Sequence, residues 1–133
     1  MSPVISPNLK VLVADDDPSL LRLVTTIVES EGLIPIAAVD GRDAYRLLKS
    51  STGLGAVIVD IKMPYIKGSD LVKFMRSNPR FANIPVIVMT GEVEANRSAK
   101  SMAAGAVAFL PKPFKNSQLR VILRTFFNRN PPK

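Results

Sequence analysis

Short apolar runs alternate with amphipathic segments along the chain. The runs are four to seven residues long and rich in Val, Ile and Leu, which is typical of strands buried on both faces of a parallel sheet. They lie at residues 9–14, 33–39, 56–59, 84–89 and 106–110. In the segments between them, apolar residues recur every three or four positions, as in helices packed on a sheet. The alternation predicts an α/β fold in which right-handed crossovers form a doubly wound, five-stranded parallel sheet.

Capping residues and helix breakers give the helix boundaries. Asp17 followed by Pro18 is a typical N-cap and first-turn pair, and Gly32 is typical of a helix end. Asp40 and Gly41 are predicted to form a turn before the second helix. The predicted helices lie at residues 18–31, around 44–48, around 71–75, at 92–104 and at 116–128. The apolar residues predicted to face inward on the last helix are Leu119, Ile122, Leu123 and Phe126.

The chain length of 133 residues is sufficient for one domain with its own core. We expect that domain at residues 9–128, with a flexible lead at 1–8 and a frayed tail at 129–133. The sequence contains no Cys and no His, which excludes thiol chemistry and the commonest general base and metal ligand. No apolar run approaches the length of a membrane span, and the first residues do not resemble a signal peptide. We therefore expect a cytoplasmic protein that does not enter a membrane.

The net charge of +7 is unevenly distributed. Residues 1–70 contain 7 Lys and Arg against 9 Asp and Glu, whereas residues 71–133 contain 11 against two. A basic half can indicate nucleic acid or an acidic partner, but a solvated basic surface is the more frequent explanation. Arg120 and Arg124, four residues apart on the last predicted helix, are interpreted as part of one solvated face.

Polar side chains follow four of the five apolar runs. Asp15 and Asp16 follow the first, Asp60 the third, Thr90 the fourth and Lys112 the fifth. Taken singly, such Asp and Thr residues are typical caps or strand ends. Because the carboxyl ends of parallel strands share one edge of the sheet, however, these side chains can converge. Carboxylates crowded together favour a cation, which must be a hard, oxygen-preferring ion such as Mg²⁺ in a chain without His or Cys.

The same set suits phosphoryl chemistry. An Asp carboxylate is a known phosphoryl nucleophile and yields an aspartyl-phosphate. Phosphoryl transfer depends mainly on positioning and charge neutralisation. A cation, the Lys112 ammonium and the Thr90 hydroxyl would supply both without a His.

Four motifs in a fixed order carry a resemblance to a known family. They occupy residues 11–18, 57–64, 85–91 and 109–114. With these motifs, the chain resembles the receiver domains of two-component response regulators over about residues 9–127. The resemblance implies the flavodoxin-like fold, a (βα)5 arrangement with strand order 2-1-3-4-5.

The resemblance also implies a role for each residue of the acidic set. Asp60 is the expected phosphoacceptor. Asp16, Asp60 and the backbone carbonyl of Lys62 are expected to bind Mg²⁺ directly, with Mn²⁺ as an alternative, and Asp15 to assist through water. Lys112 is expected to pair with the phosphoryl group, and the peptide bond between Lys112 and Pro113 to be cis.

Thr90 and Phe109 are the switch pair that the resemblance implies. On phosphorylation, Thr90 is expected to bond a phosphoryl oxygen and Phe109 to turn inward, which changes the surface of the fourth helix, fifth strand and fifth helix. The alternative interpretation of Phe109 is that it is an ordinary core residue without a switch role. The chain departs from the family pattern at Lys67, where an Asp usually precedes Gly68, and at Gly91, where an Ala is common. Lys62 is expected to face the site and to add positive charge.

The leading hypothesis is a phosphorylation-controlled signalling switch rather than an enzyme. Its expected partners are a sensor histidine kinase or a His phosphotransfer protein, and a downstream protein target. The scarcity of acids near the last helix disfavours the dimer face of DNA-binding regulators, so a monomer or weak dimer is expected.

Three alternatives remain open. The fold could serve as a constitutive adaptor with a vestigial site. The chain could be a receiver fragment of a larger DNA-binding regulator or hybrid kinase. Direct nucleic-acid binding by the basic half ranks low, because the sequence has no recognition motif and few aromatic residues.

Overall fold

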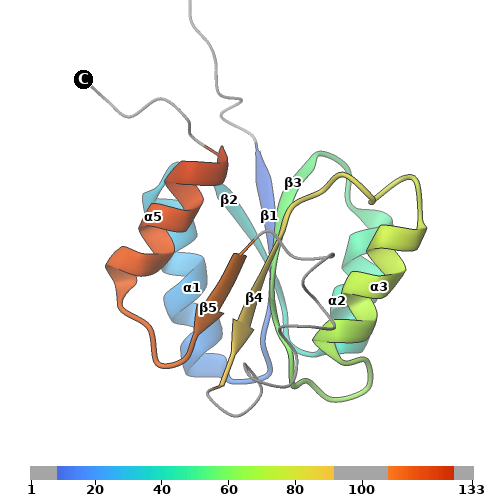
Figure 1. Ribbon diagram of the computed structural model, residues 1–133, viewed down its shortest axis with the longest axis horizontal. Helices are drawn as coiled ribbons and strands as arrows, with labels where there is room; N and C mark the ends of the chain where they lie inside the picture. Colours follow the sequence, from blue (N-terminus) through green and yellow to red (C-terminus); the bar gives the residue numbers. More distant parts are fainter. Residues whose placement is uncertain (1–8, 92–107, 128–133) are drawn as a thin grey trace, which may run out of the picture.

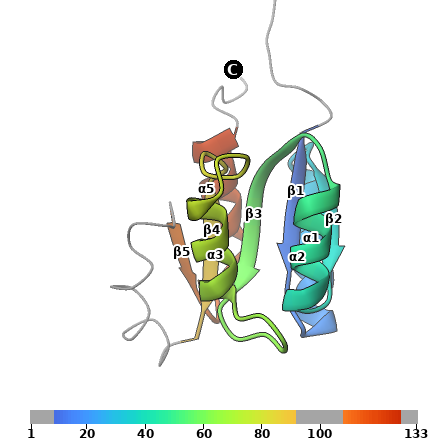
Figure 2. The ribbon, with the colours of Figure 1, turned by 90° about the vertical axis from the view of Figure 1, so that its right-hand side faces the viewer.

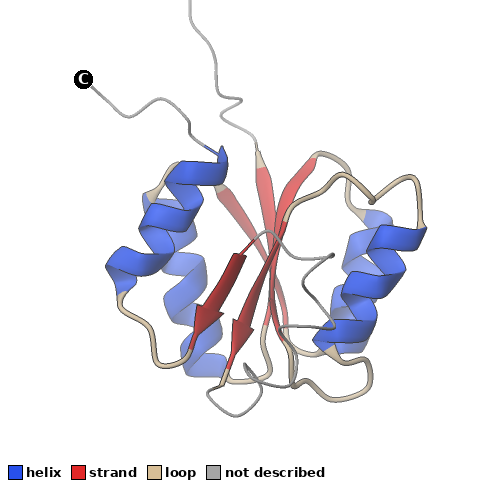
Figure 3. Cartoon of the chain, viewed as in Figure 1, coloured by secondary structure: helices blue, strands red, loops and turns tan. Residues whose placement is uncertain are grey.

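The computed structural model describes residues 9–91 and 108–127, which form a parallel sheet with helices on both faces (Figures 1 and 3). The strands are β1 (Lys10–Ala14), β2 (Ile34–Ala38), β3 (Leu54–Asp60), β4 (Val86–Thr90) and β5 (Ala108–Pro111). The helices are α1 (Pro18–Ser30), α2 (Gly41–Ser50), α3 (Gly68–Ser77) and α5 (Asn116–Phe127). The strand order is β2-β1-β3-β4-β5, all pairs being parallel, which confirms the predicted topology.

Three predicted segments lie outside the described residues. They are the helix at 92–104, the lead at 1–8 and the tail at 129–133. Among the described helices, none is both long enough and apolar enough to cross a membrane.

Helices α1 and α5 cover one face of the sheet, and α2 and α3 cover the other (Figures 1 and 2). Side chains alternate along each strand, so each strand contributes to two cores. On β1, Val11 and Val13 pack with the α1 and α5 residues, whereas Leu12 and Ala14 pack with those of α2 and α3. Burial on both faces explains why the strands appear in the sequence as continuous apolar runs.

The helix caps follow the sequence closely. The Asp17 carboxylate accepts hydrogen bonds from the backbone N–H groups of Ser19 and Leu20, at 2.9 and 3.4 Å, and Pro18 occupies the first helical turn. Gly32 has a φ of +83°, the left-handed conformation expected just beyond a helix end. The turn predicted at Asp40 and Gly41 is instead the start of α2, because the Asp40 carboxylate accepts a hydrogen bond from the backbone N–H of Asp43 at 2.7 Å.

The prediction for the inner face of α5 is correct except at one position. Leu119 and Leu123 are buried and Ile122 is half-buried against the same core. Phe126 is 40% exposed, so its predicted inward position is wrong, and the adjacent Phe127 is buried at 9% exposure. Positions 119, 123 and 127 are spaced by four residues and share one helix face, whereas Phe126 is about 100° away from Phe127 around the helix.

Arg120 and Arg124 do not form the simple solvated face that we expected. The Arg120 guanidinium donates to Glu31 Oε2 at 3.0 Å, and Arg124 donates from Nε to Glu31 Oε1 at 2.7 Å. A second Arg124 bond, from Nη2 to Oε2 at 3.0 Å, makes that pair bidentate. The two arginines therefore connect α5 to the end of α1, on the face of the sheet that both helices cover.

We expect Glu31→Gln to lower the free energy of unfolding by about 1 kcal/mol at neutral pH. The hydrogen bond from Arg124, assisted by Arg120 and opposed by burial, holds the pKa of Glu31 below its ordinary value of 4.5. A carboxyl with a lowered folded-state pKa stabilises the fold above its unfolded pKa, and this stabilisation is lost as the pH falls through the folded pKa. Urea unfolding should therefore show a higher free energy of unfolding for the wild type than for the variant at pH 7. This difference should shrink when the pH falls below the folded-state pKa of Glu31. Glu29→Gln, on the exposed side of the same turn, is the matched control.

Candidate functional site

The carboxyl ends of β1 and β3 bring three carboxylates together. The two strands pair directly, with Ala14 opposite Val59, so the acids that follow them are neighbours. Asp15 and Asp60 are buried and Asp16 is exposed. Each carboxylate places one oxygen within 4.8 Å of an oxygen of the other two. This is the convergence that the strand ends predict.

Lys112 joins the acidic group from the end of β5. Its backbone N–H donates to the Thr90 carbonyl at 2.7 Å, and its peptide bond to Pro113 is cis, as the resemblance implies. The ammonium donates to Asp60 Oδ2 at 2.8 Å and lies 3.6 Å from Asp15 Oδ2. Burial alone would lower the pKa of Lys112, but the hydrogen bond to Asp60 and the two carboxylate charges outweigh it and raise that pKa. Lys112 is therefore held in its charged form.

Asp15 is the member of the group that most needs a cation. Its Oδ1 accepts a hydrogen bond from the backbone N–H of Asp17 at 2.9 Å. Its Oδ2 is buried and accepts no hydrogen bond within the described part of the chain. Burial, together with the charge of Asp60, raises the pKa of Asp15 to about 6, against the opposing effects of the Asp17 N–H and Lys112. An orphaned oxygen beside two further carboxylates fits a hard divalent ion.

A cavity of about 300 Å³ opens beside these groups. The residues that line it are Asp16, Asp60, Ile61, Lys62, Gly91 and Lys112. Lys62, which was expected to face the site, and Gly91, one of the two departures from the family pattern, both line this cavity, whereas Lys67 does not. The backbone N–H of Lys62 also donates to Asp60 Oδ1 at 3.3 Å, so both Asp60 oxygens accept hydrogen bonds.

Thr90 and Phe109 occupy different positions relative to this cavity. Thr90 ends β4 at the same edge of the sheet and is fully buried. Its hydroxyl donates to the Gly91 carbonyl at 3.0 Å, and Thr90 does not line the cavity. Phe109, on β5, pairs with Val88 of β4. Its side chain is half-buried and packs against the core beneath α2 and α3. The structure thus groups Asp15, Asp16, Asp60 and Lys112, places Thr90 at their edge and sets Phe109 apart.

Gly68, which the sequence analysis named only as the residue that follows Lys67, lies close to the backbone of the site. Its backbone N–H donates to the Ile61 carbonyl at 2.9 Å, so α3 begins against the end of β3. A Cβ at Gly68 would overlap the carbonyl oxygen of Asp60 and lie 2.9 Å from the Cα of Ile61. The signals in the sequence were the position of Gly68 in the family pattern and the presence of a Gly at the start of a helix, where Gly has no favourable intrinsic propensity.

Gly68→Ala is accordingly expected to lower the free energy of unfolding by about 1–3 kcal/mol, although Ala is the better helix former. The added methyl group meets backbone, which cannot rotate away. Chemical denaturation measures the loss, and Ser69→Ala, one residue further along α3, is the control because it adds no atom. Unchanged or increased stability in Gly68→Ala would contradict the close approach.

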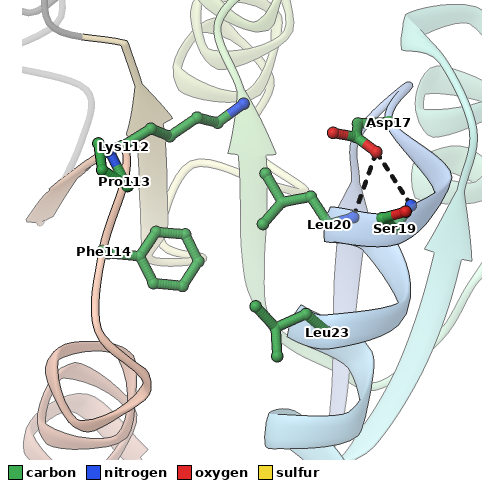
Figure 4. Close-up of a pocket in the computed structure, with 7 residues that line it drawn as sticks. All are labelled: Asp17, Ser19, Leu20, Leu23, Lys112, Pro113 and Phe114. Carbon is green, nitrogen blue, oxygen red and sulfur yellow. Dashed lines mark hydrogen bonds between the residues drawn. The ribbon is translucent and has the colours of Figure 1, made fainter.

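A second, apolar groove of about 490 Å³ lies between the start of α1 and the connection from β5 to α5 (Figure 4). Leu20 and Leu23 form one wall, and Pro113 and Phe114 form the other. Lys112 lines this groove and also the cavity at Asp60, so the two hollows adjoin at its side chain.

The fold and the site together define a class of protein: a doubly wound α/β domain with a group of three carboxylates beside a lysine at the carboxyl ends of its strands. The family model described as response regulator receiver domain matches residues 11–124. The chain belongs to this family, whose members act as signalling switches within two-component systems.

Relatives and solved structures agree with this assignment. The chain is 28% identical over 130 residues to the chemotaxis protein CheY-3 of Vibrio cholerae, which covers 97% of this chain and 99% of CheY-3. It is 33% identical over 121 residues to the transcriptional regulatory protein CpxR of Escherichia coli, covering 91% of this chain and 50% of CpxR. The receiver domain of Francisella response regulator 1452 superposes with a TM-score of 0.80 at 30% identity, covering 92% of this chain and 98% of that one.

Proposed function

We propose that this domain, which we place at residues 9–128, accepts a phosphoryl group on Asp60. The donor is a phosphohistidine of a sensor histidine kinase or His phosphotransfer protein, and the reaction depends on Mg²⁺. The observation that carries the proposal is the contact of Lys112 with Asp60, at 2.8 Å, within a cluster of three carboxylates. A buried acid with a cation on one side and further acids on the other has the charges that phosphoryl transfer needs.

In the proposed step, a carboxylate oxygen of Asp60 forms the new O–P bond while the donor's N–P bond breaks. The electron pair of that bond returns to the imidazole nitrogen of the donor. Lys112 is paired with Asp60 before the reaction. As negative charge develops on the phosphoryl oxygens, the Lys112 ammonium donates a hydrogen bond to one of them. The backbone N–H of Lys62 holds the other Asp60 oxygen and thereby fixes the orientation of the carboxylate.

Asp15, Asp16, Asp60 and the Lys62 carbonyl are the groups that we propose to hold the metal. Mg²⁺, or Mn²⁺ in its place, would neutralise the acids and the phosphoryl oxygens. The orphaned Oδ2 of Asp15 supports this assignment, because a bound cation or its water satisfies that atom.

The proposed output is a change in the surface of the fourth helix, β5 and α5. The Thr90 hydroxyl leaves the Gly91 carbonyl for a phosphoryl oxygen, and Phe109 turns inward. The two-state equilibrium of the domain shifts because only one state makes the Thr90 contact. A downstream protein reads that surface.

Mg²⁺ titration is expected to give a saturable response in amide NMR spectra at Asp60 and Lys62. Asp16→Asn should weaken the affinity for Mg²⁺ at least tenfold. Loss of a group that orients a metal ligand typically weakens metal affinity by about 10- to 100-fold. Asp17→Asn is the matched control, since Asn also caps helices and the Asp17 carboxylate is occupied by α1. A constitutive adaptor with a vestigial site would show no saturation.

Beryllofluoride, a phosphoryl mimic, tests the switch itself. With Mg²⁺ present, it should shift amide resonances at Thr90, Lys112 and along β5 beyond the shifts that Mg²⁺ alone causes. Asp60→Ala should abolish these additional shifts. Equal shifts in that variant would refute Asp60 as the phosphoacceptor.

A further inference from the structure

Three exposed cations lie on α2, and a fourth lies near the end of this helix. Helix α2 covers the face of the sheet opposite α1 and α5 (Figure 2). We call the four cations the α2 cation row; they are Arg42, Arg46, Lys49 and Arg80. The three on α2 are spaced i, i+4, i+7, which places them in one stripe about 10 Å long. Arg80 extends the row, because its guanidinium reaches the Ser51 carbonyl at 3.4 Å, just past the end of α2.

Three cations of the row lie over aromatic rings. The pairs are Arg42 over Tyr65 at 4.1 Å, Lys49 over Tyr45 at 4.3 Å and Arg80 over Phe81 at 4.9 Å, each measured to the ring centroid. The rings of Tyr45 and Phe81 are in turn packed against Phe74, with centroids 4.9 and 5.7 Å apart. Cations seated on packed rings lose less freedom on binding than free surface side chains.

The row has an excess of positive charge. Arg46 forms an ion pair with Asp43. Within the described part of the chain, Arg42, Lys49 and Arg80 form no ion pair, and all three residues are exposed. Val39 and Tyr65, which are 58% and 69% exposed, add apolar surface close to Arg42. Exposed arginine beside aromatic and aliphatic surface is the composition of protein interfaces.

We infer that the α2 cation row is a docking surface for an acidic protein segment, one that presents carboxylates along a helix at the spacing of Arg42, Arg46 and Lys49. Charge complementarity carries this choice. The exposed Val39 and Tyr65 offer apolar contacts that a protein side chain can cover and a phosphate backbone cannot. The aromatic faces are already occupied by cations, which leaves little room for the base stacking that single-stranded nucleic acids use. The inference does not depend on phosphorylation of Asp60.

The test uses the isotopically labelled full chain and a short Glu-rich helical peptide with Glu at i, i+4 and i+7. Amide resonances along α2 and at Tyr65 should shift saturably, and the affinity should fall with added salt. Arg42→Gln combined with Lys49→Gln should weaken binding about tenfold, corresponding to two exposed charge pairs. Arg22→Gln combined with Lys115→Gln, which removes two exposed cations elsewhere, should leave the affinity unchanged.

Three outcomes would overturn the inference. The first is a set of shifts centred on Lys112 or α5 instead of α2. The second is an equal loss of affinity in the two double variants, which would reveal only general attraction to a basic protein. The third is tighter binding of a DNA duplex that is lost in the α2 double variant, which would make the row a nucleic-acid surface.

Discussion

Asp60→Asn is expected to abolish covalent phosphorylation by acetyl phosphate. The amide lacks the charged oxygen that attacks phosphorus, and no other carboxylate of the site is bonded to both Lys112 and the Lys62 N–H. Intact-mass measurement in the presence of Mg²⁺ should show one added phosphoryl group in the wild type and none in the variant.

Two comparisons make this result specific. Asp17→Asn, in the same loop region but engaged in capping α1, should be phosphorylated like the wild type. The fold of Asp60→Asn should persist, because an amide can still accept from Lys112 while the change reduces repulsion with Asp15. Phosphorylation that survives in Asp60→Asn would place the acceptor elsewhere and refute the proposed function.

Lys112→Met is expected to slow phosphorylation about 100-fold or more, the usual effect of removing one preorganised donor to a developing anion. Met keeps a similar length and apolar stem but has no ammonium. Mg²⁺ should bind at least as tightly to the variant, because a competing cation has left the carboxylate cluster. Rates from acetyl phosphate, followed by mass, separate this effect from metal loss.

The same variant should also be less stable when no metal is present. Removing the ammonium leaves Asp60 without its charged partner and Asp15 without its nearest cation, although the side chains of both acids are almost fully buried. A loss of about 1–3 kcal/mol is expected in chelator, and added Mg²⁺ should restore part of it. A variant with normal phosphorylation kinetics would show that Lys112 has a structural role only.

The strand ends explain why the site could be predicted. Asp15, Asp60 and Lys112 each follow an apolar run, and a parallel sheet places all such ends at one edge. The nearest of these groups are 45 positions apart in the sequence, yet their convergence needs only the topology. Thr90 follows the same rule, but the direction of its hydroxyl depends on the Gly91 carbonyl, a local contact without a signature in the sequence.

The sequence did not determine the burial of residues where two orientations of a helix fit the pattern of apolar positions almost equally well. Phe126 and Phe127 are both large and apolar, and the sequence pattern does not distinguish them. The rotation of α5 against the sheet decides which is buried. Glu31 is separated from Arg120 by 89 positions, so the tie between α1 and α5 is invisible to any local pattern.

The sequence alone determined the succession of the strands and helices that the structure describes, the caps of α1 and the set of acids and lysine at the strand ends. These features arise from periodicity and from contacts between residues only a few positions apart. The tertiary structure decided which oxygen of Asp15 is left without a partner, how closely α3 approaches Asp60 at Gly68, and that Arg42 of α2 rests on the ring of Tyr65 from the loop after β3. Each depends on the distance between segments remote in the chain, which is set only when the helices pack on the sheet.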